Sequence, residues 1–139
     1  MKKITLFSLL SLVALFAIVS CSKTRDGLGL DTINNNARTG KWKVTHQTYL
    51  GTSSEPTLNE NLTEGNGYAE FKSDNKVHYY NNDGVENPAA AVSYSFTDTK
   101  SIMYGGQEFD IQENLAGSFS KMTLQRQTTT GREVYIFQR

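Results

Sequence analysis

Residues that could catalyse a reaction or bind a metal are few in this 139-residue chain. His46 and His78 are the only histidines, and they fall in two different predicted strands. Neither belongs to an HExxH motif or to another spacing that brings metal ligands together. A serine nucleophile would need one of them beside a G-x-S-x-G turn, which the sequence lacks. We therefore interpret both histidines as ordinary strand residues.

A pair of carboxylates offers the other chemical possibility. Glu108 and Asp110 are two residues apart in a predicted strand, so they share one face, as a carboxylate pair in a glycosidase site does. Phe109 and Ile111 alternate with them, which is typical of a strand with one buried and one solvated face. We interpret the two carboxylates as residues of the solvated outer face of this strand. The sequence thus predicts a protein that is not an enzyme and binds neither a metal nor a cofactor.

The only cysteine, Cys21, directly follows the only long apolar segment, residues 4–19. Lys2 and Lys3 precede this segment, and the small residue Ser20 separates it from the cysteine. A charged start, a short apolar stretch and a small residue at its end are typical of a secretory signal peptide. A spanning helix would need ~20 apolar residues and different flanks. We therefore expect residues 1–20 to be a signal peptide outside the fold.

An ordinary signal peptide would leave a secreted protein with one reactive thiol. The run Ile18, Val19, Ser20, Cys21 instead resembles the lipobox of bacterial lipoproteins, although Leu is more usual at the first position and Ala or Ser at the second. This resemblance implies lipidation of Cys21 with a diacylglycerol and palmitate, and two or more acyl chains give a stable membrane anchor. Ser22, where inner-membrane lipoproteins carry Asp, implies the outer membrane by the same resemblance. Whether the domain faces the periplasm or the cell surface stays open.

The remaining chain carries little net charge. Removing residues 1–20 takes two lysines from 14 basic residues and nothing from 14 acidic residues. The slightly negative balance offers no basic surface for a nucleic acid. No cysteine follows position 21, so no disulfide can stabilise the domain. Residues 21–39 are polar and rich in Asn and Gly, which predicts a lipidated flexible tether, with the single folded domain at 40–139.

From residue 41 onward, apolar and polar residues alternate with period two, which indicates strands with one buried face. Turn residues fill most of the gaps, and short connections of this kind join antiparallel neighbours. Two connections are long: 51–66, with room for a short helix near 58–63, and 82–91. The pattern predicts an all-β, mostly up-and-down fold of eight strands at 41–50, 67–73, 76–81, 92–98, 101–105, 107–113, 120–127 and 132–139.

Closing these strands into a barrel would remove the exposed sheet edges. An immunoglobulin-like sandwich is the rival fold, but it would need longer connections. Gly40, Lys41 and Trp42 spell the G-x-W that opens the first strand of lipocalins, and FKSDNKVHYY resembles the small lipocalin-like lipoproteins of Gram-negative bacteria. This resemblance implies an eight-stranded barrel in which Trp42 closes one end under an arginine, for which Arg139 is preferred to Arg126.

An eight-stranded barrel has an interior that side chains can fill or that can hold one small ligand. Tyrosine hydroxyls inside it would need partners, which a ligand or trapped water would supply. We expect a noncatalytic module that binds a small hydrophobic or amphipathic molecule, and plain core packing of these side chains is the alternative. The predicted inward-facing ligand-binding residues are Phe71, Tyr79, Tyr94, Phe96, Tyr104, Phe109, Met122 and Leu124.

The alternative is a solid barrel that acts through its surface. Tyr49, Tyr68 and Tyr80 fall on predicted outer positions, and tyrosine is enriched at protein interfaces. Such a protein would serve as an interaction module or inhibitor with a protein partner in the cell envelope.

Overall fold

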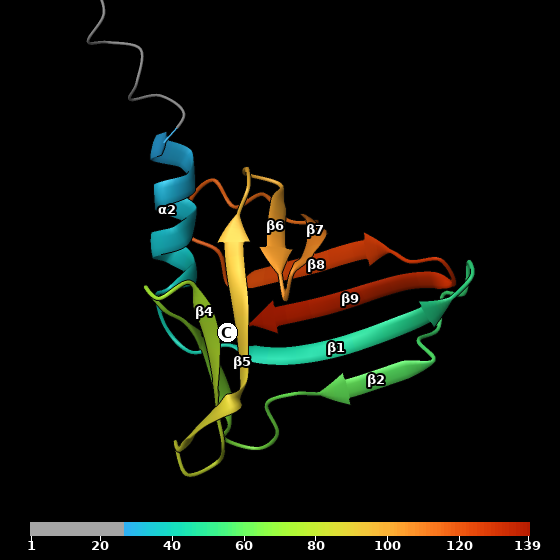
Figure 1. Ribbon diagram of the computed structural model, residues 1–139, viewed down its shortest axis with the longest axis horizontal. Helices are drawn as coiled ribbons and strands as arrows, with labels where there is room; N and C mark the ends of the chain where they lie inside the picture. The colour runs from blue at the N-terminus through green and yellow to red at the C-terminus, as the bar shows by residue number, and fades with distance from the viewer. Residues whose placement is uncertain (1–26) are drawn as a thin grey trace, which may run out of the picture.

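A computed structural model describes residues 27–139 of the chain (Figure 1). The predicted signal peptide (1–20) and the lipidation site Cys21 lie outside these residues. Within 27–139, no helix is long and apolar enough to cross a membrane. The elements are α2 (Gly27–Ala37), β1 (Lys43–Leu50), β2 (Leu58–Asn61), β3 (Tyr68–Phe71), β4 (Lys76–Tyr80), β5 (Glu86–Phe96), β6 (Ser101–Tyr104), β7 (Gln107–Ile111), β8 (Lys121–Gln127) and β9 (Gly131–Gln138).

All the strands belong to one curled antiparallel sheet, with the order β2-β1-β9-β8-β7-β6-β5-β4-β3. Just before β1, Trp42 pairs with Ala69 of β3, the strand at the other end of this order. The Trp42 amide donates to the Ala69 carbonyl over 2.9 Å, and the Ala69 amide donates to the Trp42 carbonyl over 2.8 Å. The sheet therefore curls into a barrel-like shape (Figure 1). The prediction of an all-β, antiparallel fold is confirmed.

Two stretches of sheet depart from the predicted strands. Residues 58–61 form β2 rather than a short helix, because Thr57 and Leu62 donate backbone hydrogen bonds to the β1 carbonyls of Thr48 (2.7 Å) and Val44 (2.8 Å). Pairing along β1 satisfies these backbone groups, which decides the conformation of the polar LNEN segment. β5 begins at Glu86, six residues earlier than predicted, and its register with β4 shifts between Val77 and Tyr79.

Residues 27–37 form helix α2, so the prediction of a flexible tether over 21–39 is wrong for this part. Ile33 is 1% exposed and Ala37 is fully buried, and both belong to the core. Leu30 packs against the same core, so the three apolar side chains lie on one face of the helix. The Trp42 indole donates to the carbonyl of Ala37 over 2.9 Å, which fixes the end of the helix at the start of the sheet. An isolated helix of this length is marginal in water, and this packing stabilises it.

The core lies on the concave side of the sheet, where alternate residues of every strand except β2 turn inward. Trp42 is surrounded by other aromatic rings of this core. Its ring centroid lies 5.8 Å from that of Phe119, 6.1 Å from that of Phe71 and 6.5 Å from that of Phe137. Aromatic pairs at such separations add to the free energy gained by burial. The largest fully buried side chains are Trp42, Phe71, Phe137, Ile33, Ile102, Leu115, Met122, Leu124, Val44 and Val77.

Candidate functional site

The eight residues predicted to bind a ligand do converge inside the sheet, but they pack against one another. Each is at most 7% exposed. Phe71 contacts Tyr94 at 4.8 Å and Phe137 at 5.2 Å between ring centroids, and Tyr104 contacts Phe109 at 6.2 Å. These side chains (Phe71, Tyr79, Tyr94, Phe96, Tyr104, Phe109, Met122 and Leu124) therefore form the core.

The interior tyrosines find their hydrogen-bond partners within the protein. The hydroxyls of Tyr79 and Tyr104 are 2.8 Å apart. The Tyr94 hydroxyl donates to the Lys72 carbonyl over 3.0 Å and accepts from Arg38 Nε over 2.9 Å. Burial raises the pKa of Tyr79 to about 12 despite its bond to Tyr104, and burial also raises the pKa of Tyr104. Both therefore stay neutral, and within residues 27–139 no buried side-chain nitrogen or oxygen lacks a partner.

Trp42 and Arg139 meet as predicted, at the end of the sheet next to α2. The Arg139 guanidinium carbon lies 4.1 Å from the Trp42 ring centroid. The same guanidinium donates to the carbonyls of Phe119 (Nε, 3.2 Å) and Asn36 (3.1 Å), and also to that of Thr39. Gly40 has a φ of 88°, which a glycine adopts without strain, and this turn leads the chain from α2 to Trp42. We call this the closed end.

The opposite end holds an apolar pocket where β5 bulges away from β4. Between Val92 and Asn87 the pairing skips several β5 residues, among them Pro88, which cannot donate a ladder hydrogen bond. The pocket has a volume of about 290 Å³. We call it the β4–β5 pocket, and it is lined by Leu62, Tyr79, Tyr80, Asn81, Asn87, Ala90 and Val92.

A second pocket of about 280 Å³ shares Val92 with the β4–β5 pocket. The hydrogen-bonded pair Tyr79 and Tyr104 contributes one ring to each pocket. Its lining combines charged and aromatic side chains. The other lining residues come from β6 to β9 and the β6–β7 turn: Tyr104, Gly105, Gln107, Phe109, Arg126, Glu133 and Tyr135. The two pockets together form what we call the open end.

Glu133 organises the polar part of the open end. Its Oε2 accepts from Arg126 Nε (2.9 Å) and Nη2 (2.6 Å), and its Oε1 lies 3.1 Å from His46 Nε2 and 3.3 Å from the Tyr135 hydroxyl. Burial alone would raise the pKa of Glu133, but the bonds from Arg126 and His46 outweigh burial and lower it. The carboxylate therefore stays ionised beside a cation. Arg126 Nη1 also donates to Gln107 over 2.9 Å.

The sequence pattern did not identify this polar cluster. His46, Arg126 and Glu133 come from β1, β8 and β9. Arg126 of β8 pairs directly with Glu133 of β9, and His46 of β1 pairs with Tyr135, two residues further along β9. Each falls on an inner position of its strand, in phase with buried neighbours such as Val44 and Leu124. The sequence signal that could have indicated this cluster is a charged or polar residue at a strand position where the pattern predicts a buried apolar one.

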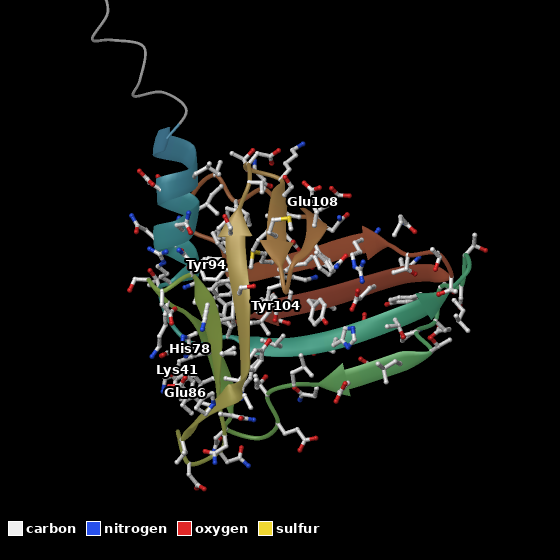
Figure 2. All side chains as sticks on the ribbon, in the orientation of Figure 1. Lys41, His78, Glu86, Tyr94, Tyr104 and Glu108 are labelled. Atoms are coloured by element: carbon white, nitrogen blue, oxygen red, sulfur yellow. The ribbon has the colours of Figure 1, made fainter. Side chains whose placement is uncertain are left out.

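His78 has two carboxylate partners on the outer surface. Figure 2 labels His78 and Glu86 near each other at the β4–β5 side of the sheet. The Nδ1 atom of His78 lies 2.5 Å from Glu86, and its Nε2 atom lies 2.7 Å from Asp74. Glu108 and Asp110 are exposed on another part of the sheet, as a solvated face would be. No group of three or more His, Cys, Asp or Glu residues within 27–139 is arranged to hold a metal ion.

The outer tyrosines pair with cations. Tyr68 and Tyr80 stack with ring centroids 4.7 Å apart, and the Nζ atoms of Lys41 and Lys72 lie 3.9 Å and 5.2 Å from the Tyr68 and Tyr80 rings. Tyr49 lies under the Arg132 guanidinium at 3.9 Å. These aromatic surfaces are partly covered by their own lysine and arginine neighbours.

Comparison with known proteins adds no family to this picture. No protein-family model matches the chain, and no curated protein matches it. The function is therefore inferred from the fold and from the geometry of its two ends.

Proposed function

We infer that this protein is a membrane-anchored lipoprotein whose noncatalytic, lipocalin-like barrel binds a small hydrophobic or amphipathic molecule at its open end. The observation that carries this proposal is the apolar β4–β5 pocket, which shares Val92 with a pocket lined by the Arg126 and Glu133 cluster. Apolar walls with a few fixed polar groups are typical of small-molecule sites.

The strand arrangement supports a lipocalin-like interpretation. β2 pairs with β1 from Thr45 to Thr48, and Ala69 of β3 pairs with Trp42 just before β1. If β2 and β3 are counted together as one interrupted second strand, the nine strands would correspond to the eight of an up-and-down barrel, which supports the proposal. The contact between Trp42 and Arg139 supports the same interpretation.

The site differs from the one expected within the core. The interior aromatic residues fill the space between the strands, so a ligand would contact the outer side of this core, at Tyr79 and Val92. About 290 Å³ is close to the lower limit of ligand pockets, roughly 300 Å³, which suits a small molecule or one end of a longer chain. A polar group of the ligand would lie toward Arg126 and Tyr135.

The anchor belongs to the same proposal. A lipid on Cys21 would hold the domain at the outer membrane, and α2 begins six residues after this cysteine. The barrel would then lie near the membrane surface, where hydrophobic and amphipathic molecules are found.

Native mass spectrometry of the protein purified from bacterial membranes with mild detergent tests ligand binding. We expect an additional mass on the native protein that denaturation releases, and saturable uptake of a fluorescent fatty-acid probe. A native mass equal to that of the lipidated chain alone, with no uptake of the probe, would contradict the proposal.

The filled core and the outer tyrosines favour a second candidate function. A solid barrel would act as an interaction module or inhibitor in the cell envelope, with the stacked Tyr68 and Tyr80 at the interface. A photocrosslinker placed at Tyr68 should then capture one envelope protein in cells, and the same crosslinker at exposed Asp110 should not.

A further inference from the structure

A third pocket lies at the closed end, between α2, the turn that joins β3 to β4, and the last residues of β5. Its volume is about 280 Å³. We call it the α2 pocket. Asp31, Asn34 and Asn35 line it from the helix, Arg38 from the turn that directly follows the helix, Asn75 from the β3–β4 turn, and Ser95 and Phe96 from β5.

The residues that line the α2 pocket from the helix and from the position just after it form one continuous stripe. Asp31, Asn34, Asn35 and Arg38 are spaced at i, i+3, i+4 and i+7, which places them on one face of a helix. Leu30, Ile33 and Ala37 face the core instead. The helix therefore presents three polar side chains to this pocket, and Arg38, just after the helix, adds a fourth.

Hydrogen bonds hold the polar groups in place before any ligand arrives. Arg38 Nε donates to the Tyr94 hydroxyl over 2.9 Å, and Arg38 Nη2 donates to Asn75 Oδ1 over 3.2 Å. Asn75 has a φ of 60°, the left-handed conformation that Asn tolerates better than most residues. These bonds use two of the five N–H groups of Arg38 and fix the plane of its guanidinium.

The charges of the α2 pocket cancel. Asp31 and Arg38 contribute one charge of each sign, and the other polar side chains are amides and a hydroxyl. An anion would meet the Asp31 carboxylate, and a cation would meet the guanidinium. An apolar ligand would remove Asn34 and Asn35 from water without replacing their hydrogen bonds, which costs free energy.

A neutral sugar matches this set of groups best. Each hydroxyl of a sugar both donates and accepts hydrogen bonds, and an Asn amide offers two donors and one acceptor oxygen in a plane. Phe96, which is 6% exposed, adds an aromatic side chain to the polar walls. We propose that the α2 pocket binds an uncharged sugar residue, with Asn34, Asn35, Arg38 and Asn75 as its hydrogen-bonding partners. This site is independent of the ligand proposed for the open end.

Two-dimensional NMR of the ¹⁵N-labelled protein, titrated separately with glucose, galactose and N-acetylglucosamine, tests this inference. At least one sugar should produce saturable shifts confined to the backbone amides of α2, Asn75 and Ser95. Asn35→Ala should weaken that binding by about fivefold, the factor expected for the loss of one ordinary hydrogen bond. The Asn35 side chain is exposed, so this variant should keep the wild-type spectrum elsewhere.

The neighbouring Asn36 supplies the matched control. Its amide donates to the Gly117 carbonyl over 2.6 Å, and it does not line the α2 pocket. Asn36→Ala should therefore leave sugar affinity unchanged. Equal weakening by Asn35→Ala and Asn36→Ala would overturn the inference, because it would trace the effect to the helix rather than to the pocket.

Titration with inorganic phosphate separates a sugar site from an anion site. We expect phosphate to leave the amides of α2 and Asn75 unshifted, and we expect sugar affinity to stay constant as salt is added, since neutral ligands are little affected by screening. Saturable phosphate shifts that grow stronger in Asp31→Asn would overturn the proposal, as would the absence of shifts with every sugar.

Discussion

At the scale of single residues, His78 is the group whose protonation matters most for the outer sheet. Both of its ring nitrogens face carboxylate oxygens, Glu86 at 2.5 Å and Asp74 at 2.7 Å, and only the protonated imidazole can donate to both. The bond to Glu86 raises the pKa of His78, burial opposes that rise, and Asp74 adds to it.

The direction of this shift predicts how stability depends on pH. A raised pKa in the folded protein means that the stabilisation is complete below the unfolded value, 6.5, and is lost as the pH rises through the folded value. We expect NMR titration to give His78 a pKa above 6.5, and denaturation in urea to show a free energy of unfolding that falls over the same interval. Glu86→Gln should reduce both effects. A pKa for His78 at or below 6.5 would contradict the double contact.

Asp74 responds in the opposite direction at acid pH. The bond from His78 lowers the pKa of Asp74, desolvation opposes that shift, and the hydrogen bond from the Lys76 amide adds to the lowering. Its stabilisation is therefore present above the unfolded value of 3.8 and is lost as the pH falls through the lower folded value. The outer cluster should thus be most stable between the two transitions.

Arg139 makes a residue-scale contribution at the closed end. Arg139→Ala removes the cation–π contact with Trp42 and the hydrogen bonds to three carbonyls, those of Asn36, Thr39 and Phe119. We expect the free energy of unfolding to fall by about 1–2 kcal/mol, measured in urea. Arg132→Ala provides the comparison, because Arg132 covers the Tyr49 ring at a similar 3.9 Å without the set of carbonyl hydrogen bonds that Arg139 makes. A larger loss in Arg132→Ala would be inconsistent with Arg139 joining α2 to the sheet.

At the scale of elements, α2 belongs to the folded domain. Ile33→Ala deletes a side chain that is 1% exposed and should lower the free energy of unfolding by about 2–4 kcal/mol. Thermal and urea denaturation measure this loss. Asn35→Ala, on the exposed face of the same helix, should change stability by less than about 0.5 kcal/mol. Similar small losses in both variants would mean that the helix does not pack on the core.

The strands were more predictable from the sequence than the helix. Alternation is strong where one face is buried, as in Val77 and Tyr79 of β4, so most strands were found with small errors at their ends. The apolar residues of α2 are few and are separated by Thr and Asn, which favour turns as much as helices. Contacts with Trp42 and the core decide the helical conformation, and a local pattern does not contain them.

β2 and the first half of β5 were missed for a related reason. β2 is exposed at every position, so no buried face produces a period, and its conformation comes from pairing with β1. In β5, Pro88 and the alanines after it resemble a loop, and the register shift opposite His78 keeps them in the sheet. The β4–β5 pocket lies at this same register shift. Because the alternation of apolar and polar residues does not indicate the shift, the sequence predicts the ligand site in the core instead.

At the scale of the whole molecule, the two ends of the curled sheet differ in character. α2, Trp42 and Arg139 close one end and connect it to the segment that leads toward Cys21. The other end exposes the β4–β5 pocket and the Arg126 and Glu133 cluster. A module anchored through its closed end would keep the end for which we propose ligand binding accessible.

Two alanines in β5 allow a direct test of ligand binding at the open end. Ala90 is half-buried and lines the β4–β5 pocket, whereas Ala89 is exposed and does not line it. We would titrate a fluorescent fatty-acid probe into the wild type, Ala90→Trp and Ala89→Trp. The account predicts saturable binding that Ala90→Trp abolishes and Ala89→Trp retains. Binding that survives Ala90→Trp unchanged, or a wild-type protein that takes up no probe, would contradict it.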